Sequence, residues 1–224
     1  TDGMEKFFPA EKIMITGNPV RAVIAESKIV REEAIRFFGL DPNRKTILSI
    51  GGSLGAKTIN EAIDADLDKL GSNDIQLIWQ TGRPYAERGR EASKGNQRVW
   101  VSEFIKEMEY AFAAADVVIS RAGAMAIAEL CVVGKPSIFV PYPFAAEDHQ
   151  TVNARTLEAK HAGIMIRDED AKNRLVDEAI RLVRDDNKMK SLSKNIEALG
   201  VRDADMIIAK EILGIPDSGL RIPD

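Results

Sequence analysis

Two glycine-rich turns are the residues most suited to chemistry, because each could bind phosphate. The first, Gly51-Gly52-Ser53-Leu54-Gly55, follows an apolar run and precedes a helical pattern. A strand that passes through glycines into a helix points unpaired N–H groups, and the positive end of the helix dipole, at one spot that attracts phosphate. The second turn is Ser120-Arg121-Ala122-Gly123-Ala124. Because tight turns need glycine whether or not anything binds, each turn alone leaves both interpretations open.

Two polar residues could complete a diphosphate site. Ser53 could add a hydroxyl donor, and it could equally cap the helix that follows. Arg21, which comes after Gly17-Asn18-Pro19-Val20, could supply positive charge to a diphosphate. The alternative for Arg21 is an exposed position at the start of a helix.

Further polar residues could recognise sugars. Glu129 lies six residues past Gly123 in an otherwise apolar helical pattern. A carboxylate is costly to bury unless it is paired or accepts hydroxyl donors. A ribose hydroxyl pair would satisfy it, as would an ion pair with Arg121 or Lys135. Gln150 and Asn153 follow a proline-rich loop and could contact sugar hydroxyls; their alternative is helix capping, which suits Asp148 better than Gln150.

Composition narrows the class of protein. The chain has 224 residues, a net charge of −4 and one cysteine, Cys131, in an apolar stretch that predicts burial. The acidic balance argues against non-specific nucleic-acid binding. Two histidines and one cysteine do not allow a multi-histidine or cysteine-based metal site, and Asp168-Glu169-Asp170 is interpreted as a solvated turn or helix end. No apolar run is long enough to cross a bilayer, and the opening Thr1-Asp2-Gly3-Met4 looks like a cut inside a longer protein.

Short apolar runs alternate with helical patterns along the chain. This alternation predicts an α/β fold, a Rossmann-like parallel sheet with helices on both faces. We expect one domain over 1–224, with a core over roughly 4–213 and a tail over 214–224. Strands are predicted at 12–16, 46–50, 75–80, 98–101, 117–119, 137–140 and 163–166, and helices at 22–38, 57–70, 84–93, 107–114, 124–133 and 148–160, with further helices to about 213. Trp79 and Trp100 are assigned to the core, and both glycine turns and the loop 141–150 fall at the carboxyl edge of the sheet.

Together these motifs resemble the donor-binding C-terminal half of the MurG family, glycosyltransferases with the GT-B fold. The matching segments are Gly17 to Arg21, Gly51 to Ala56, Asp116 to Ala124, Glu129, Pro141 to Pro143, and Glu147 to Ala154. The resemblance implies that the diphosphate and uridine of UDP-GlcNAc are bound by Arg21, Ser53, the main chain around Ile105, the N–H groups of Ala124, Met125 and Ala126, and Glu129, with Gly52 as a possible addition. It implies that Gln150, with His149 and Asn153 as possible partners, contacts the GlcNAc hydroxyls. It implies no metal, no cofactor and no catalytic residue within this chain.

The same resemblance implies an activity. The family transfers GlcNAc with inversion from UDP-GlcNAc to lipid I, giving lipid II, at the cytoplasmic face of the bacterial membrane. Its acceptor site, its membrane contact and its general base lie in an N-terminal domain that this chain lacks, so we expect the chain alone to be soluble and not to turn over. Many relatives have threonine where this chain has Ala126, which removes one hydroxyl donor to phosphate.

Two alternatives remain at this stage. One is another GT-B enzyme that uses a UDP-sugar, such as a glycolipid glucosyltransferase or a UDP-GlcNAc 2-epimerase-like protein. The other is a non-catalytic nucleotide-binding domain, because glycine turns alone do not require catalysis.

Overall fold

The computed structural model describes residues 8–214, so most of the expected tail lies outside the described residues. Six strands form one sheet in the order β3-β2-β1-β4-β5-β6, and every neighbouring pair is parallel. Because β1 lies between β2 and β4, the winding direction of the sheet reverses at β1 and β4. Ligands of such sheets bind beyond the carboxyl ends of the strands at this reversal. The strands are β1 (Lys45–Ile50), β2 (Ile75–Gln80), β3 (Val99–Ser102), β4 (Val117–Ser120), β5 (Ser137–Phe139) and β6 (Ile164–Met165).

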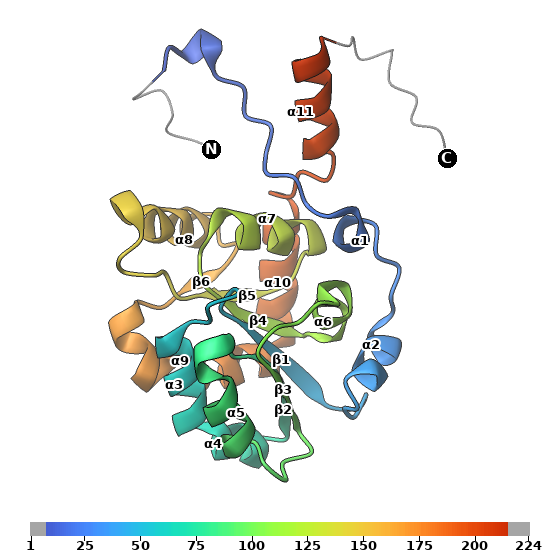
Figure 1. Cartoon of the computed structure of the whole chain (residues 1–224), viewed down its shortest axis with the longest axis vertical. Helices are drawn as coiled ribbons and strands as arrows, with labels where there is room; N and C mark the ends of the chain where they lie inside the picture. Colours follow the sequence, from blue (N-terminus) through green and yellow to red (C-terminus); the bar gives the residue numbers. More distant parts are fainter. Residues whose placement is uncertain (1–7, 215–224) are drawn as a thin grey trace.

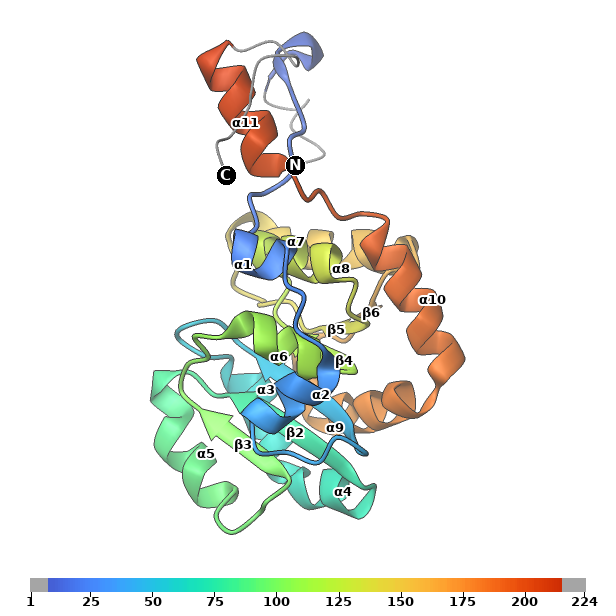
Figure 2. The ribbon, with the colours of Figure 1, turned by 90° about the vertical axis from the view of Figure 1, so that its right-hand side faces the viewer.

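Helices cover both faces of the sheet (Figures 1 and 2). Side chains of a strand alternate between faces, and β1 illustrates this. Leu48 packs in a cluster with Ile35 and Phe112, whereas Ile47 packs in the opposite cluster with Ile59. The helices are α1 (Ala22–Ala25), α2 (Arg31–Phe37), α3 (Lys57–Ala65), α4 (Leu67–Ser72), α5 (Ala86–Ala92), α6 (Met108–Ala114), α7 (Ala124–Val133), α8 (His149–Ala159), α9 (Asp168–Arg184), α10 (Asp186–Glu197) and α11 (Ala204–Leu213), with 3-10 turns η2 (Ala10–Lys12), η3 (Arg83–Tyr85) and η4 (Ala146–Asp148).

The predicted fold class is therefore confirmed. The strand predicted at 75–80 and the helix predicted at 124–133 have the observed bounds of β2 and α7. Trp79 is fully buried, Trp100 packs against the same core as Phe38, and Cys131 is buried. Burial raises the pKa of the Cys131 thiol to about 11, so it stays protonated at neutral pH.

Three predicted elements were wrong. Residues 12–16 form no strand, because a 3-10 turn ends at Lys12 and the extended segment after it pairs with none of the described strands. The helix predicted over 22–38 is two helices, α1 and α2. Between them the Ser27 hydroxyl accepts a hydrogen bond from the Ile29 N–H, which competes with helical pairing. The helix predicted over 57–70 breaks at Asp66, whose φ of −117° is not helical.

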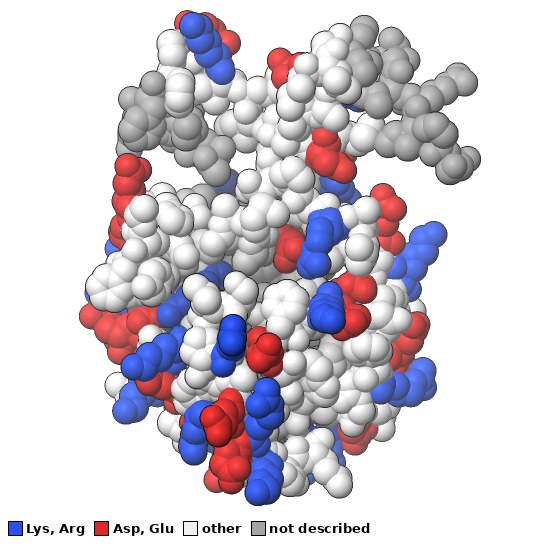
Figure 3. All heavy atoms as spheres, viewed as in Figure 1, with Lys and Arg blue, Asp and Glu red and all other residues white. Residues whose placement is uncertain are grey.

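The segment that leads into α1 and the helix α11 extend from the same end of the molecule (Figure 1). Arg202, between α10 and α11, ties this end down by donating to the carbonyls of Ala25 and Val132. The face in Figure 3 is mostly uncharged over α7 and α8, whereas basic and acidic side chains are interspersed over the lower part. Within residues 8–214, no helix has the length and apolar character needed to cross a membrane.

Candidate nucleotide-sugar site

The first glycine turn is held in place by contacts that only glycine permits. Gly55 has a φ of +73°, and a Cβ built on it would lie 2.1 Å from the Thr81 carbonyl oxygen. A Cβ built on Gly82, which has the same φ, would lie 2.2 Å from the Gly55 nitrogen. From the next strand, Gln80 donates to the Gly52 carbonyl at 2.9 Å. The turn is thus locked against the end of β2, which leaves Ser53 exposed near its tip.

Ser53 does not cap the helix that follows. The N-cap of α3 is Ala56, with no side-chain cap bond, so the capping alternative for Ser53 was wrong. An exposed hydroxyl beyond the end of β1 remains compatible with the predicted phosphate contact, which stays a prediction.

The second turn presents the start of α7. Gly123 is its N-cap, and the first hydrogen bond of the helix runs from the Ile127 N–H to the Gly123 carbonyl at 3.0 Å. The N–H groups of Ala124, Met125 and Ala126 therefore have no acceptor within the helix. The positive end of the helix dipole adds to them, so this end of α7 is suited to an anion even though Ala126 contributes no hydroxyl.

Glu129 lies one turn further along α7, and its partner is Arg21. Arg21 Nη2 is 3.5 Å from Glu129 Oε1, and the two side chains are 53% and 17% exposed. Burial raises the pKa of Glu129, and the charge of Arg21 opposes that rise. The predicted alternatives for an ion pair, Arg121 and Lys135, were both wrong, since they bind Asp168 and the Ala115 carbonyl. Two residues predicted to contact one ligand are thus adjacent.

Side chains at the start of α8 form hydrogen bonds with the second turn and with the loop after β5. Gln150 Oε1 accepts from the N–H groups of Ala122 and Tyr142, at 3.2 and 3.0 Å. Asn153 donates to the Ala122 carbonyl at 3.1 Å. The helix-capping alternative was therefore wrong for both. Asp148 does occupy the N-cap position, but its carboxylate accepts from the Thr151 hydroxyl.

The remaining predicted residues are less closely connected. His149 lies at the start of α8, where its Nδ1 is 2.7 Å from the Ala146 carbonyl. Ile105 follows β3 and is only 1% exposed as a whole residue, so its main chain is buried along with its side chain, and the predicted main-chain contact with uracil stays a prediction. Within the described part of the chain, no hydrogen bond joins Ile105 or Ser53 to the other predicted residues. Ile105 and Ser53 lie at the same carboxyl edge of the sheet as the other predicted residues, without a hydrogen bond to them.

An ion pair beside the site was missed by the sequence analysis. Arg121, inside the second glycine turn, pairs with Asp168 at the start of α9, and both side chains are less than one fifth exposed. Asp168 lies at a helix end as predicted, but the interpretation of its carboxylate as solvated was wrong. An arginine within a glycine turn was the available signal. Among residues 8–214 there is no cluster of three or more potential metal-ligating His, Cys, Asp or Glu side chains.

The parallel sheet with its reversal, the locked turn after β1 and the open helix start after β4 fit the nucleotide-binding half of a GT-B-type glycosyltransferase. The comparison with known families agrees. Residues 46–207 match the model described as "Glycosyltransferase family 28 C-terminal domain". The chain belongs to glycosyltransferase family 28.

Curated relatives carry a more specific name. The chain is 54% identical over 219 residues to the UDP-N-acetylglucosamine--N-acetylmuramyl-(pentapeptide) pyrophosphoryl-undecaprenol N-acetylglucosamine transferase of Parabacteroides distasonis. That match covers 96% of this chain and 59% of the relative. The protein of the same name from Bacteroides fragilis is 50% identical, with 95% and 57% covered. The chain thus spans somewhat under two thirds of the length of these relatives.

Solved structures agree with the fold. MurG of Acinetobacter baumannii superposes with a TM-score of 0.71 at 25% identity, covering 85% of this chain and 55% of that one. The UDP co-structure of MnaA from S. aureus gives 0.67 at 12% identity, covering 99% and 60%, which shows a shared fold alone. The resemblance to the MurG family that the motifs predicted is confirmed.

Proposed function

We propose that this chain is the donor-binding part of an N-acetylglucosaminyltransferase. The whole enzyme would transfer GlcNAc from UDP-GlcNAc to lipid I, the undecaprenyl-pyrophosphoryl muramyl pentapeptide, and so make lipid II for peptidoglycan. The names of the relatives, which include both UDP-N-acetylglucosamine and the undecaprenyl-linked acceptor, support both substrates.

The observation that carries this proposal is the start of α7 together with the ion pair one turn along it. Three N–H groups at Ala124 to Ala126 suit a diphosphate, while Glu129 and Arg21 already lie within 3.5 Å of each other. When donor binds, the guanidinium would turn to the diphosphate and the carboxylate would accept the ribose hydroxyls. This exchange replaces one weak, half-exposed ion pair by charge-assisted hydrogen bonds to the ligand.

The same groups would also assist the chemistry. Cleavage of the bond between GlcNAc and UDP leaves negative charge on the departing diphosphate. Fixed N–H donors and a helix dipole aimed at that charge stabilise the transition state more than the ground state. A metal is not required for this step, because the helix start and Arg21 already supply positive charge.

The rest of the reaction would lie outside this chain. We propose that the remaining part of the relatives' length supplies the acceptor site, the contact with the cytoplasmic face of the membrane and the base that deprotonates the acceptor hydroxyl. The chain alone would then bind UDP-GlcNAc weakly at best and form no lipid II.

The test is a transfer assay on the full-length enzyme with UDP-GlcNAc and a lipid I analogue. We expect lipid II to form, and Glu129→Ala and Ser53→Ala to reduce its formation while circular dichroism stays unchanged. Glu91→Ala, at a carboxylate that is 68% exposed on α5, is the matched control and should keep full activity. Absence of lipid II from the wild-type enzyme, or full activity of Glu129→Ala, would contradict the proposal.

An arm of the assay without acceptor separates the 2-epimerase-like alternative. Conversion of the donor at C2 of its sugar in that arm would assign the chain to that class. Stable binding of UDP with neither product would assign it to non-catalytic nucleotide binding.

A further inference from the structure

Two loops at the carboxyl edge of the sheet are joined by one guanidinium. Arg121 follows β4, and its Nη1 donates to the carbonyls of Val140 and Pro141, which follow β5, at 3.1 and 3.0 Å. The guanidinium carbon also lies 5.5 Å from the centre of the Tyr142 ring. Arg121 therefore links the turn after β4 to the segment after β5, beside the main-chain hydrogen bond from the Val140 N–H to the Ser120 carbonyl at 2.9 Å.

The position of Arg121 is in turn held by a partly buried acceptor, the carboxylate of Asp168. One oxygen of Asp168 pairs with Arg121, and the other accepts from the Thr58 hydroxyl on α3 at 2.8 Å. A guanidinium that lies 14% exposed needs such a partner, because an unpaired buried charge is costly. The network thus links α3, α9 and the two loops beneath the proposed donor site.

A second link joins the same two loops through Gln150. Its Oε1 accepts from the N–H of Ala122, next to Arg121, and from the N–H of Tyr142. Both distances depend on the spacing between the two loops, to which the contacts of Arg121 contribute. A change in that spacing would break at least one of the two hydrogen bonds.

These two bonds also determine which way the carboxamide faces. A flipped carboxamide would place its NH2 group against two N–H donors, so the oxygen must face the main chain. The Nε2 group is left without a partner in the described part of the chain. Gln150 can therefore offer a ligand hydrogen-bond donors but no acceptor oxygen with a free approach.

We propose that Arg121 and Asp168 are positioning residues that hold the carboxamide of Gln150 with its NH2 group toward the donor sugar. Gln150 then recognises a GlcNAc hydroxyl oxygen strictly as a hydrogen-bond donor. This inference rests on the proposed function, and it adds the polarity of the sugar contact and the residues that impose it.

Modified donors test the polarity on the full-length enzyme. Affinities are measured for UDP-GlcNAc and for its deoxy and deoxyfluoro analogues at C3, C4 and C6, with wild type and Gln150→Ala. The contacted hydroxyl is the one whose removal costs affinity in wild type but not in Gln150→Ala. There we expect the deoxy donor to bind about five- to tenfold more weakly, the size of one net hydrogen bond.

The fluoro donor is decisive, because carbon-bound fluorine accepts a hydrogen bond but cannot donate one. It should bind more tightly than the deoxy donor in wild type, and the two should be equal in Gln150→Ala. Equal loss for both analogues in wild type, or no hydroxyl coupled to Gln150, would overturn the inference.

Asp168→Asn tests the positioning role, with Asp170→Asn as its control. Asp170 lies on the same first turn of α9, but its side chain is 43% exposed and pairs with Arg174, on the same helix. We expect Asp168→Asn to weaken UDP-GlcNAc binding about fivefold while leaving UDP binding unchanged, and the loss should not add to that of Gln150→Ala. Asp168→Glu should restore part of the affinity, and Asp170→Asn should behave as wild type.

A purely structural role for Asp168 would give a different result. UDP and UDP-GlcNAc would then lose affinity equally, or the losses of Asp168→Asn and Gln150→Ala would add, and the positioning role would be wrong. If the proposed function itself fails, wild type shows no preference for UDP-GlcNAc over UDP, which is a separate and recognisable outcome.

Discussion

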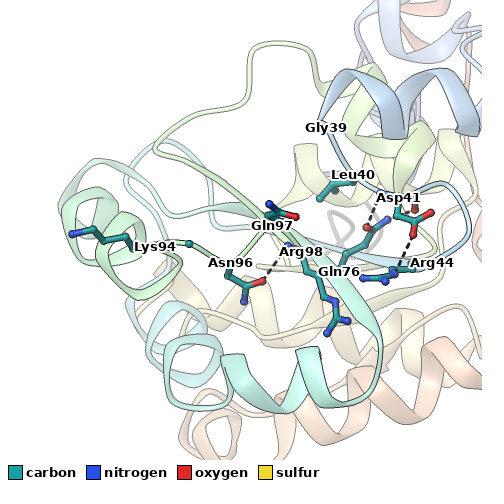
Figure 4. Close-up of a pocket in the computed structure, with 10 residues that line it drawn as sticks. Gly39, Leu40, Asp41, Arg44, Gln76, Lys94, Asn96, Gln97 and Arg98 are labelled. Atoms are coloured by element: carbon teal, nitrogen blue, oxygen red, sulfur yellow. Dashed lines mark hydrogen bonds and ion pairs between the residues drawn. The ribbon is translucent and has the colours of Figure 1, made fainter.

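The two edges of the sheet differ in how their polar groups are used. At the amino edge lies a hollow of about 820 Å³, lined by residues that begin the strands or precede them, including Asp41, Arg44, Gln76 and Arg98 (Figure 4). An apolar groove of about 500 Å³ begins at Ala124, at the carboxyl edge, runs along α7 and α8 as far as Cys131 and Lys160, and is smaller. Size alone would favour the amino edge.

The hydrogen bonds favour the carboxyl edge. In the amino-edge hollow, Arg44 pairs with Asp41 and Asp74, Arg98 pairs with Asp74, and Gln76 binds both main-chain groups of Asp41. These groups satisfy one another, so an anion would have to break existing pairs. At the carboxyl edge, within residues 8–214, the first N–H groups of α7 and the NH2 group of Gln150 have no such partners. Unused donors indicate a binding site better than the volume of a hollow does.

The largest effect that separates the two edges is expected from glycine substitutions. Gly55→Ala should destabilise the protein by about 3 kcal/mol or more, because it adds both backbone strain and a steric overlap with the next strand's loop. Gly39→Ala, in the amino-edge hollow, has a similar φ of +67° but nothing within 4 Å of the new Cβ. It should cost only about 1 kcal/mol.

Urea unfolding measures the free energy of unfolding of both glycine variants, and calorimetry measures their affinity for UDP. Equal losses of stability for the two variants would mean that the first turn is not locked against β2, and that the two edges are equally tolerant of substitution.

Glu129→Gln should weaken UDP binding by about 10- to 100-fold, because hydrogen bonds from ribose hydroxyls to a charged carboxylate are stronger than those to a neutral amide. It should also stabilise the free protein at neutral pH. Since burial raises the folded pKa of Glu129 above its ordinary value, wild type loses stability as pH rises through the carboxylate range.

The advantage of Glu129→Gln should therefore grow as pH rises above the ordinary carboxyl pKa and vanish below it. Thermal unfolding over this range measures it. Asp41→Asn, at the amino edge, is the matched control and should leave UDP affinity unchanged. A Glu129→Gln variant that binds UDP as wild type does would remove the carboxylate from the proposed site.

These differences also show which parts of the fold could be predicted from the sequence. The strands β1 and β2 were predictable because continuous apolar runs in an α/β pattern indicate buried parallel strands. The break between α1 and α2 was not, since it depends on the hydroxyl of Ser27 competing with helical pairing. The segment after Lys12 has a strand-like composition but finds no partner in the sheet, and pairing is not a local property.

The site was predictable in its residues but not in its pairing. A carboxylate in the apolar helix α7 was a clear signal, yet its partner Arg21 lies 108 positions away and was predicted only as a separate phosphate contact. Arg121 and Asp168 are 47 positions apart, and neither spacing nor periodicity relates them. Long-range ion pairs follow from how the layers pack, which local patterns do not encode.

A buried lysine at the amino edge gives a pH test that the carboxyl edge should not share. Lys135, just before β5, has its pKa lowered to about 8 by burial. The unfolded chain keeps its proton to higher pH, so folding releases a proton and stability rises as pH increases through this window. Wild type should gain about 1 kcal/mol between about pH 7.5 and about pH 9 relative to Lys135→Met.

Chemical unfolding at each pH measures the Lys135 effect, and UDP affinity should not change in Lys135→Met. A parallel pH dependence of the two proteins would mean that the ammonium is solvated in the folded state.

The smallest effect should come from the arginine in the amino-edge hollow that most resembles an anion ligand. Arg98→Gln removes a charge that already binds the Gly71 carbonyl at 2.8 Å and Asp74 at 3.5 Å. Since these contacts are partly exposed, we expect a loss of less than about 1 kcal/mol in stability and no change in the affinity for UDP. Titration of Arg98→Gln with UDP and with inorganic phosphate measures this, beside Arg21→Gln as the positive case. Weaker binding of either ligand by Arg98→Gln would show that the larger hollow binds anions, and that a guanidinium group in an ion pair can still bind a ligand.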